Sequence, residues 1–87
     1  MMRKDENYFE MWLADRESIV NTMVRNMAAD LECGYDYFGK SITGQREMIA
    51  AYKAKTDAAL DMFKGMEDRQ VNRWCYYDLI KRGAITA

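Results

Sequence analysis

The sequence contains no histidine, so the side chain that most often serves as a general base or a metal ligand is missing. Its two cysteines, Cys33 and Cys75, are too few for a disulfide framework or a zinc site. No apolar run approaches the length of a membrane span. The start of the chain does not resemble a signal peptide, because Arg3 and Lys4 lead into the polar residues 5–7. We therefore expect a cytoplasmic, non-enzymatic protein without a metal or a cofactor.

Proline is also absent, and the five glycines leave long uninterrupted segments between them. This pattern is typical of a few long helices joined by short turns. With 87 residues, of which 49% are apolar and 31% charged, the chain has the composition of one small globular domain. We expect residues 1–87 to form a single all-α domain, a long antiparallel helical hairpin followed by a shorter third helix. Such a three-helix bundle could also dimerise.

The formal net charge is −1, so no strong overall field draws the chain to nucleic acid or to anionic lipid. The charge is unevenly distributed, however. Residues 1–36 carry four basic and eight acidic side chains, whereas residues 37–87 carry nine basic and six acidic ones. The acidic half and the basic half could attract each other in the fold.

Glycines and charged residues mark the expected helix ends. The first helix should span about residues 5–32, with acids near its positive N-terminal end. The second should span about 41–64 and the third about 67–82. Ile85 should fold back as the apolar contact of a Schellman ending. The glycines expected to stop the three helices are Gly34, Gly65 and Gly83.

The first helix has more apolar surface than one neighbouring helix would cover. One stripe on its helical projection consists of Phe9, Leu13, Val20, Val24, Met27 and Leu31. A second group beside it consists of Tyr8, Trp12, Ile19 and Met23. We therefore expect this helix to be central, packed against two helices or against a second copy of the chain. A homodimer is the most common form of such self-association.

The other two helices have narrower apolar seams. In the second helix, alternating steps of three and four residues connect Ile42, Gln45, Ile49, Tyr52, Thr56, Ala59, Phe63 and Met66. Its far face should be solvated and carries Arg46, Lys53, Asp57, Asp61 and Lys64. The third helix has an inner row of Val71, Cys75 and Leu79, flanked by Trp74. Cys75 is therefore expected to be a small core residue.

The segment Gly34–Ser41 matches the pattern G-x-x-x-x-G-K-[ST] and opens a helix, so it resembles a Walker A loop. The preceding element is expected to be a helix and not the strand that a P-loop follows, and its variable positions are three rings and a carboxylate. We therefore favour a glycine-bounded interhelical loop over a nucleotide site. Lys40 and the free amides at the start of the second helix could still hold an anion.

The same loop offers a second hypothesis, because aromatic side chains are enriched at interface hot spots. Alternatively, the rings could fold back and plug the open end of the hairpin. The residues that we predict to contact a protein partner are Tyr35, Asp36, Tyr37, Phe38 and Lys40 in the loop, with Trp12 and Met23 on the first helix.

The third helix supports an alternative function, binding of DNA or RNA. It combines cations with rings that can stack on bases. The candidate residues are Arg69, Arg73, Trp74, Tyr77, Lys81 and Arg82. The acidic overall balance and the lack of a helix-turn-helix spacing argue against this alternative.

The C-terminal segment from Trp74 to Ile85 looks like the tails of short proteins carried by bacterial phages and mobile elements. Some small acidic proteins of that kind inhibit host defence machinery, including CRISPR effectors, by binding a protein surface. This resemblance implies a protein partner and transfers no functional residue. Our leading prediction is a protein-interaction module that self-associates, with inhibition of a host defence protein as a more specific form of that hypothesis.

Overall fold

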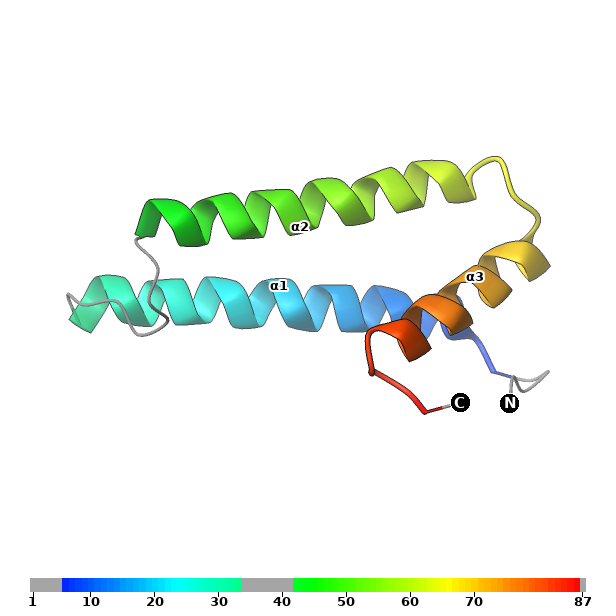
Figure 1. Cartoon of the computed structure of the whole chain (residues 1–87), viewed down its shortest axis with the longest axis horizontal. Helices are drawn as coiled ribbons and strands as arrows, with labels where there is room; N and C mark the ends of the chain where they lie inside the picture. The colour runs from blue at the N-terminus through cyan, green and yellow to red at the C-terminus, as the bar shows by residue number, and fades with distance from the viewer. Residues whose placement is uncertain (1–5, 34–41, 87) are drawn as a thin grey trace.

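The structure is a computed structural model, and it describes residues 6–33 and 42–86, except for the side chains of Cys33 and Ile42. Within these residues the chain forms α1 (Tyr8–Cys33), α2 (Ile42–Phe63) and α3 (Asp68–Lys81) and no strand (Figure 1). The all-α prediction of a long hairpin with a shorter third helix is therefore confirmed. The expected helix ends lie within three residues of those observed.

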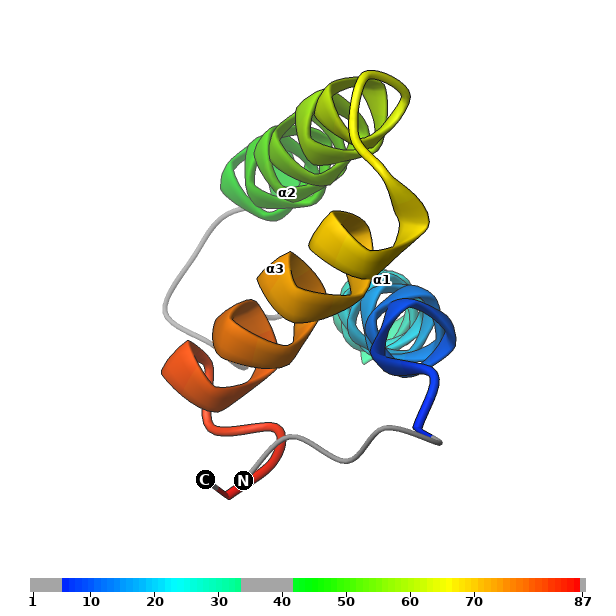
Figure 2. The same cartoon turned by 90° about the vertical axis from the view of Figure 1, so that its right-hand side faces the viewer.

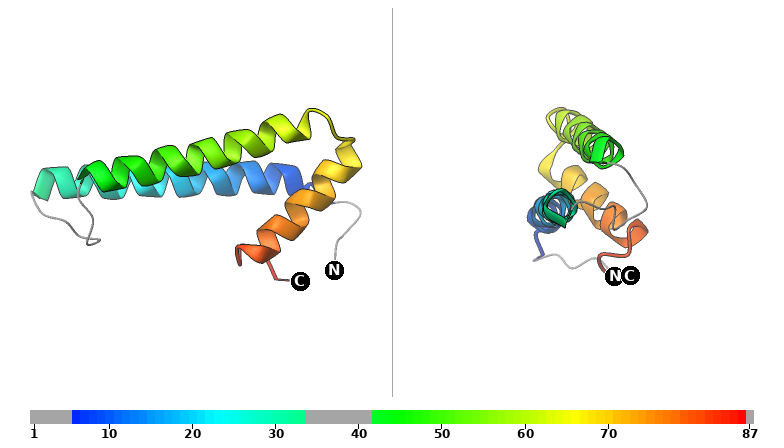
Figure 3. Two further views of the ribbon diagram at one scale, coloured as in Figure 1. Left: turned by 45° about the horizontal axis from the view of Figure 1, so that its top comes forward. Right: turned by 90° about the vertical axis from the view of Figure 1, so that its left-hand side faces the viewer.

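The two long helices run antiparallel side by side, and α3 crosses one end of the pair (Figures 1 and 3). That end holds the start of α1 and the end of α2. Among the described residues, only α1 and α2 extend to the opposite end (Figure 2 shows the bundle along its length). The resulting shape is elongated, with extents of 48 × 26 × 16 Å. Helix α1 packs against both other helices, as expected for a central helix, whereas α2 and α3 have little backbone contact.

The hydrophobic core lies where the three helices meet. It contains the inner row of α3, Val71, Cys75 and Leu79, which confirms that prediction. Rings from all three helices fill the remaining space, with centroid distances of 5.4 Å for Trp12–Phe63 and 5.0 Å for Phe63–Trp74. The full set of buried core residues is Tyr8, Trp12, Phe63, Val71, Cys75, Tyr76 and Leu79.

Polar contacts as well as the buried Ile49 join α1 and α2 outside the aromatic core. Gln45 Nε2 donates a 2.7 Å hydrogen bond to Asp30 Oδ2, and both side chains are buried. Arg16 Nε donates to Thr56 Oγ1, and its Nη2 lies 2.6 Å from Asp57 Oδ1. Every described position of the expected α2 seam is buried or half-buried, so that prediction is confirmed. Its polar members, Gln45 and Thr56, bind partners on α1.

Side chains from distant parts of the chain fix the helix ends. Asn7 Oδ1 accepts the backbone N–H of Glu10 at 3.0 Å, which caps α1. Asn72 of α3 holds the same end: its Oδ1 accepts the N–H of Tyr8 at 2.7 Å, and its Nδ2 donates to the carbonyl of Glu6. The start of α1 is thus attached to α3, and the cap at Asn7 accounts for a helix that begins at Tyr8, later than the sequence predicts.

Helix α3 ends in the expected Schellman motif. Gly83 has a φ of +76°. Its N–H donates to the carbonyl of Ile80, and the N–H of Ala84 donates to the carbonyl of Leu79. Ile85 packs against the core beyond this turn. The chain direction therefore reverses at Gly83, as predicted.

Candidate interaction surfaces

The predicted partner-binding residues are not all available at the surface. Trp12 is only 1% exposed and belongs to the core, so its prediction as a partner contact is corrected. Its ring packs edge to face against Phe63 and Trp74. Met23 is half-buried on α1. The loop residues Tyr35, Asp36, Tyr37, Phe38 and Lys40, and the whole Walker-like segment, lie outside the described residues.

The two apolar groups of α1 are buried to different extents along the helix. The second group, with Trp12, faces the rest of the bundle. The first stripe, beyond the reach of α3, is partly uncovered, with Val24 41% and Leu31 55% exposed. Together with the half-buried Val20 and Met27, these residues form what we call the open stripe. Helical periodicity places it on the flank of α1 away from Tyr8 and Asp15, which contact α3.

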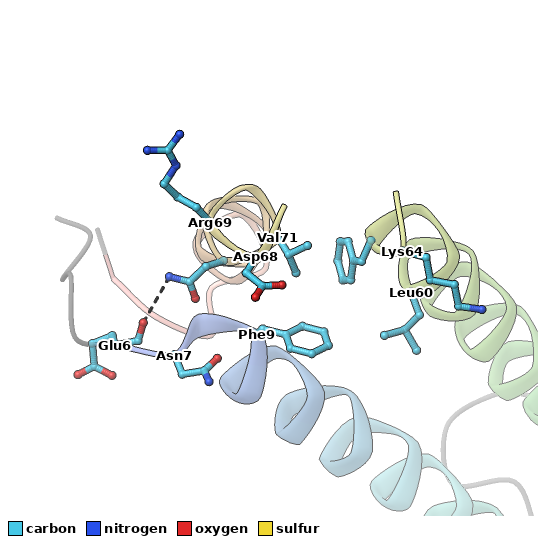
Figure 4. Close-up of a pocket in the computed structure, with 10 residues that line it drawn as sticks. Glu6, Asn7, Phe9, Leu60, Lys64, Asp68, Arg69 and Val71 are labelled. Carbon is cyan, nitrogen blue, oxygen red and sulfur yellow. Dashed lines mark hydrogen bonds between the residues drawn. The ribbon is translucent and has the colours of Figure 1, made fainter. Parts of the chain in front are cut away.

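A shallow depression of about 760 Å³ lies at the three-helix end of the bundle, between the start of α1, the end of α2 and the start of α3 (Figure 4). Phe9, Leu60 and Val71 face its interior, whereas Arg69 extends away from it. Its charged lining residues are two acids and two bases, Glu6, Asp68, Lys64 and Arg69. Because these charges cancel, the depression has no net charge that would favour an ion of either sign.

On α3, four of the six residues predicted to bind nucleic acid share one exposed face. They recur every fourth position and form what we call the basic row: Arg69, Arg73, Tyr77 and Lys81. Tyr77 is 62% exposed. None of the three cations forms an ion pair within the described part of the chain. The other two predicted residues have structural roles: Trp74 packs against the core, and Arg82 is held by carboxylates.

Arg82 connects all three helices. Its Nη1 lies 2.9 Å from Asp15 Oδ2 of α1 and donates to Tyr52 Oη of α2 at 2.9 Å. Its Nε lies 3.1 Å from Asp78 Oδ2, an oxygen that also accepts the indole N–H of Trp12 at 2.8 Å. The guanidinium carbon is 6.0 Å from the centre of the Trp12 ring. The sequence predicts this cation as a nucleic-acid contact, but in the fold it links the three helices.

A groove of about 570 Å³ runs between α2 and α3 next to this link. The indoles of Trp12 and Trp74 line it, with ring centroids 6.1 Å apart. Small side chains on α2, Ala58 and Ala59, keep it open. Its lining also includes one thioether, three cations and one carboxylate, which belong to Met62, Lys55, Lys81, Arg82 and Asp78. Sequence patterns do not reveal this groove, because it forms only where α1 holds the other two helices apart.

Cys75 is the one cysteine whose side chain is described, and it is fully buried. Burial and the nearby Asp78 carboxylate raise its pKa to about 12, although Arg82 partly offsets this rise. Such a thiol stays protonated at neutral pH and is a packing group, as predicted. Among the described residues, no three acidic or cysteine side chains cluster as metal ligands would.

Comparison of the chain with protein-family models, with curated proteins and with solved structures finds no match. The resemblance of the C-terminal segment to phage-borne proteins therefore stays a prediction. No helix in the described ranges is both long and apolar enough to cross a bilayer.

Proposed function

We propose that the chain is a non-enzymatic protein-interaction module that pairs with a second copy of itself through the open stripe. The observation that carries this proposal is the exposure of Val24 and Leu31 on a helix whose other apolar face is already buried. Exposed apolar side chains are common singly, but a row along one helix is typical of a partner surface.

The spacing of the open stripe suits a helical partner. Steps of four, three and four residues separate Val20, Val24, Met27 and Leu31, which is the pattern of a coiled-coil seam. On the outer flank of the stripe lie Asn21 and Ala28, whose small side chains allow a second helix to approach closely. A seam of this kind is self-complementary, so a second copy of the chain fits it in an isologous dimer.

The expected affinity is modest. Burial of a half-exposed valine or leucine contributes about 1 kcal/mol to the free energy of dimerisation. In a symmetric dimer each such residue is buried in both copies. After the loss of translational and rotational freedom, we expect a dissociation constant of about 10–100 µM. The module would therefore exchange between monomer and dimer at ordinary laboratory concentrations.

A matched pair of variants tests the surface. Val24→Glu places a charge in the open stripe, whereas Thr22→Glu places the same charge two residues earlier, on a different exposed face of α1. Light scattering after size exclusion should show that Val24→Glu raises the dissociation constant of the dimer by a factor of about 10 or more and that Thr22→Glu changes it little. Equal behaviour of the two variants would contradict the proposed surface.

Nucleic-acid binding is the second candidate, favoured by the alignment of Arg69, Arg73 and Lys81 beside an exposed tyrosine. Along the helix axis Arg69 and Arg73 are about 6 Å apart and Arg73 and Lys81 about 12 Å, so the three cations could contact phosphates of one strand. Tyr77 could stack on a base.

Gel-shift titrations with single-stranded DNA at several salt concentrations test this candidate. Three phosphate contacts predict a slope of log K against log salt of about −2. Arg73→Ala should make that slope less steep by about 0.7, whereas Lys53→Ala, on α2, should leave it unchanged. No shift at low salt would eliminate the candidate.

A further inference from the structure

We infer that the groove between α2 and α3 is a binding site for a small organic anion that joins a flat apolar body to a carboxylate. The site lies on the side of the bundle formed by Lys55, Lys81 and the two indoles. It shares no residue with the open stripe, so the inference does not depend on self-association.

The apolar part of the site consists of two indole rings, two alanines and a methionine. Trp12 and Trp74 meet edge to face, which is the favoured geometry for two aromatic rings, and both line the groove. Opposite them, Ala58 and Ala59 leave room that larger residues would fill. Met62, which is 44% exposed, lies at the groove with a flexible thioether that adapts to flat ligands. A volume of about 570 Å³ is in the usual range for small-molecule sites.

The polar part of the site carries a positive charge. Three cations line the groove, Lys55, Lys81 and Arg82, against one carboxylate, Asp78. Even when Asp15, which pairs with Arg82, is counted as well, one positive charge is left. Asp78 already accepts the Trp12 indole N–H and faces the Arg82 guanidinium. Lys55 and Lys81 form no ion pair with any described residue, so their charges are available to an incoming anion.

The arrangement of these groups selects the chemistry of the ligand. The two lysines belong to the two helices that form the groove, Lys55 to α2 and Lys81 to α3, and Arg82 is fixed by Asp15, Asp78 and Tyr52. A ring lying against Trp74 would therefore have a cation on either side for a carboxylate on its edge. A neutral ring would keep the stacking and lose the charge attraction, and a cation would be repelled.

The test uses the full chain and 2-naphthoate as the probe. The chain has two tryptophans, both of which line the groove, so their indole N–H signals in a ¹H–¹⁵N NMR spectrum report on it directly. We expect both signals to shift and saturate with a dissociation constant between about 10 µM and 1 mM. The neutral 2-naphthamide should bind at least about 5-fold more weakly.

Matched variants separate the groove from general charge attraction. Lys55→Ala with Lys81→Ala should weaken 2-naphthoate about 5-fold or more. Lys53→Ala with Arg73→Ala removes equal charge from the same two helices outside the groove, and should change affinity less than about 2-fold. Ala58→Phe, at an exposed position, should fill the groove and abolish binding. The absence of a saturable shift, equal loss in the two double variants, or full binding by Ala58→Phe would each overturn the inference.

Discussion

At the scale of single residues, the fold depends most on one cation. Arg82 contacts Asp15, Tyr52 and Asp78, which belong to three different helices, and lies over Trp12. Its Nη2 is buried and has no hydrogen-bond partner within the described residues. The carboxylates beside it need its charge, so its loss would leave them unpaired in a partly buried site.

Replacing Arg82 by an uncharged side chain of similar length measures the contribution of its charge to stability. Arg82→Met should lower the free energy of unfolding by about 1.5–3 kcal/mol, because Asp15 and Asp78 lose their partner. Arg73→Met, at an exposed position of the same helix, should change it by less than about 0.5 kcal/mol. Urea titrations followed by circular dichroism measure both. If Arg82→Met lowers the free energy of unfolding no more than Arg73→Met does, the contacts of Arg82 with Asp15 and Asp78 do not stabilise the fold.

Cys75 supplies a prediction with a defined pH dependence. Its pKa in the folded chain, about 12, lies above the ordinary value of 9.0. The unfolded chain therefore releases the thiol proton first, and this group's contribution to stability should be lost as pH rises from about 9 to about 12.

At pH 8 the folded thiol should react with iodoacetamide only as fast as the protein opens. Mass spectrometry that distinguishes Cys33 from Cys75 measures each rate. Labelling of Cys75 in the folded chain at the rate seen in urea would contradict its burial.

At the scale of helices, periodicity predicted some features and missed others. The α2 seam and the inner row of α3 were predicted because each helix has one apolar face and one solvated face. On α1 the pattern predicted two apolar faces but not which of them the bundle would bury. That choice depends on Trp12, whose ring fits between Phe63 and Trp74, a fit that no single-helix pattern contains.

Polar contacts between helices were also beyond the sequence pattern. Asp30 and Asn72 are polar residues for which the helical pattern predicted no partner. In the fold Asp30 pairs with Gln45, and Asn72 binds the start of α1. Both contacts join residues at least 15 positions apart, so they exist only after the helices are packed. The α2–α3 groove was missed for the same reason, whereas the basic row follows from spacing alone.

Helix ends offer a matched test of backbone conformation. A Cβ added at Gly83 would meet nothing within 4 Å, but its φ of +76° disfavours any L side chain. A Cβ added at Gly65 would lie 3.8 Å from the carbonyl oxygen of Met62, an ordinary contact without a positive φ. Gly83→Ala should therefore lower the free energy of unfolding by about 1 kcal/mol, and Gly65→Ala should leave it unchanged or raise it slightly. Thermal or urea unfolding that ranks the two variants in the opposite order would contradict this account.

At the scale of the whole molecule, the fold is asymmetric along its length. One end has three helices around an aromatic core. The other has two helices, joined by the buried Asp30–Gln45 pair and by Ile49, with an apolar stripe on α1 (Figure 1). A second copy would supply the missing cover. Pairing of two hairpins in this way would turn the thinner end into a four-helix arrangement, which is a common solution for helical chains of this size.

Sedimentation equilibrium of the unmodified chain tests this pairing most directly. Over concentrations from about 10 to about 500 µM, the weight-average mass should rise from near the monomer value of 10.2 kDa towards twice that value. Val24→Glu should stay near 10.2 kDa over most of the range. A mass that remains at 10.2 kDa for the unmodified chain at every concentration would contradict the proposal that the open stripe binds a second copy.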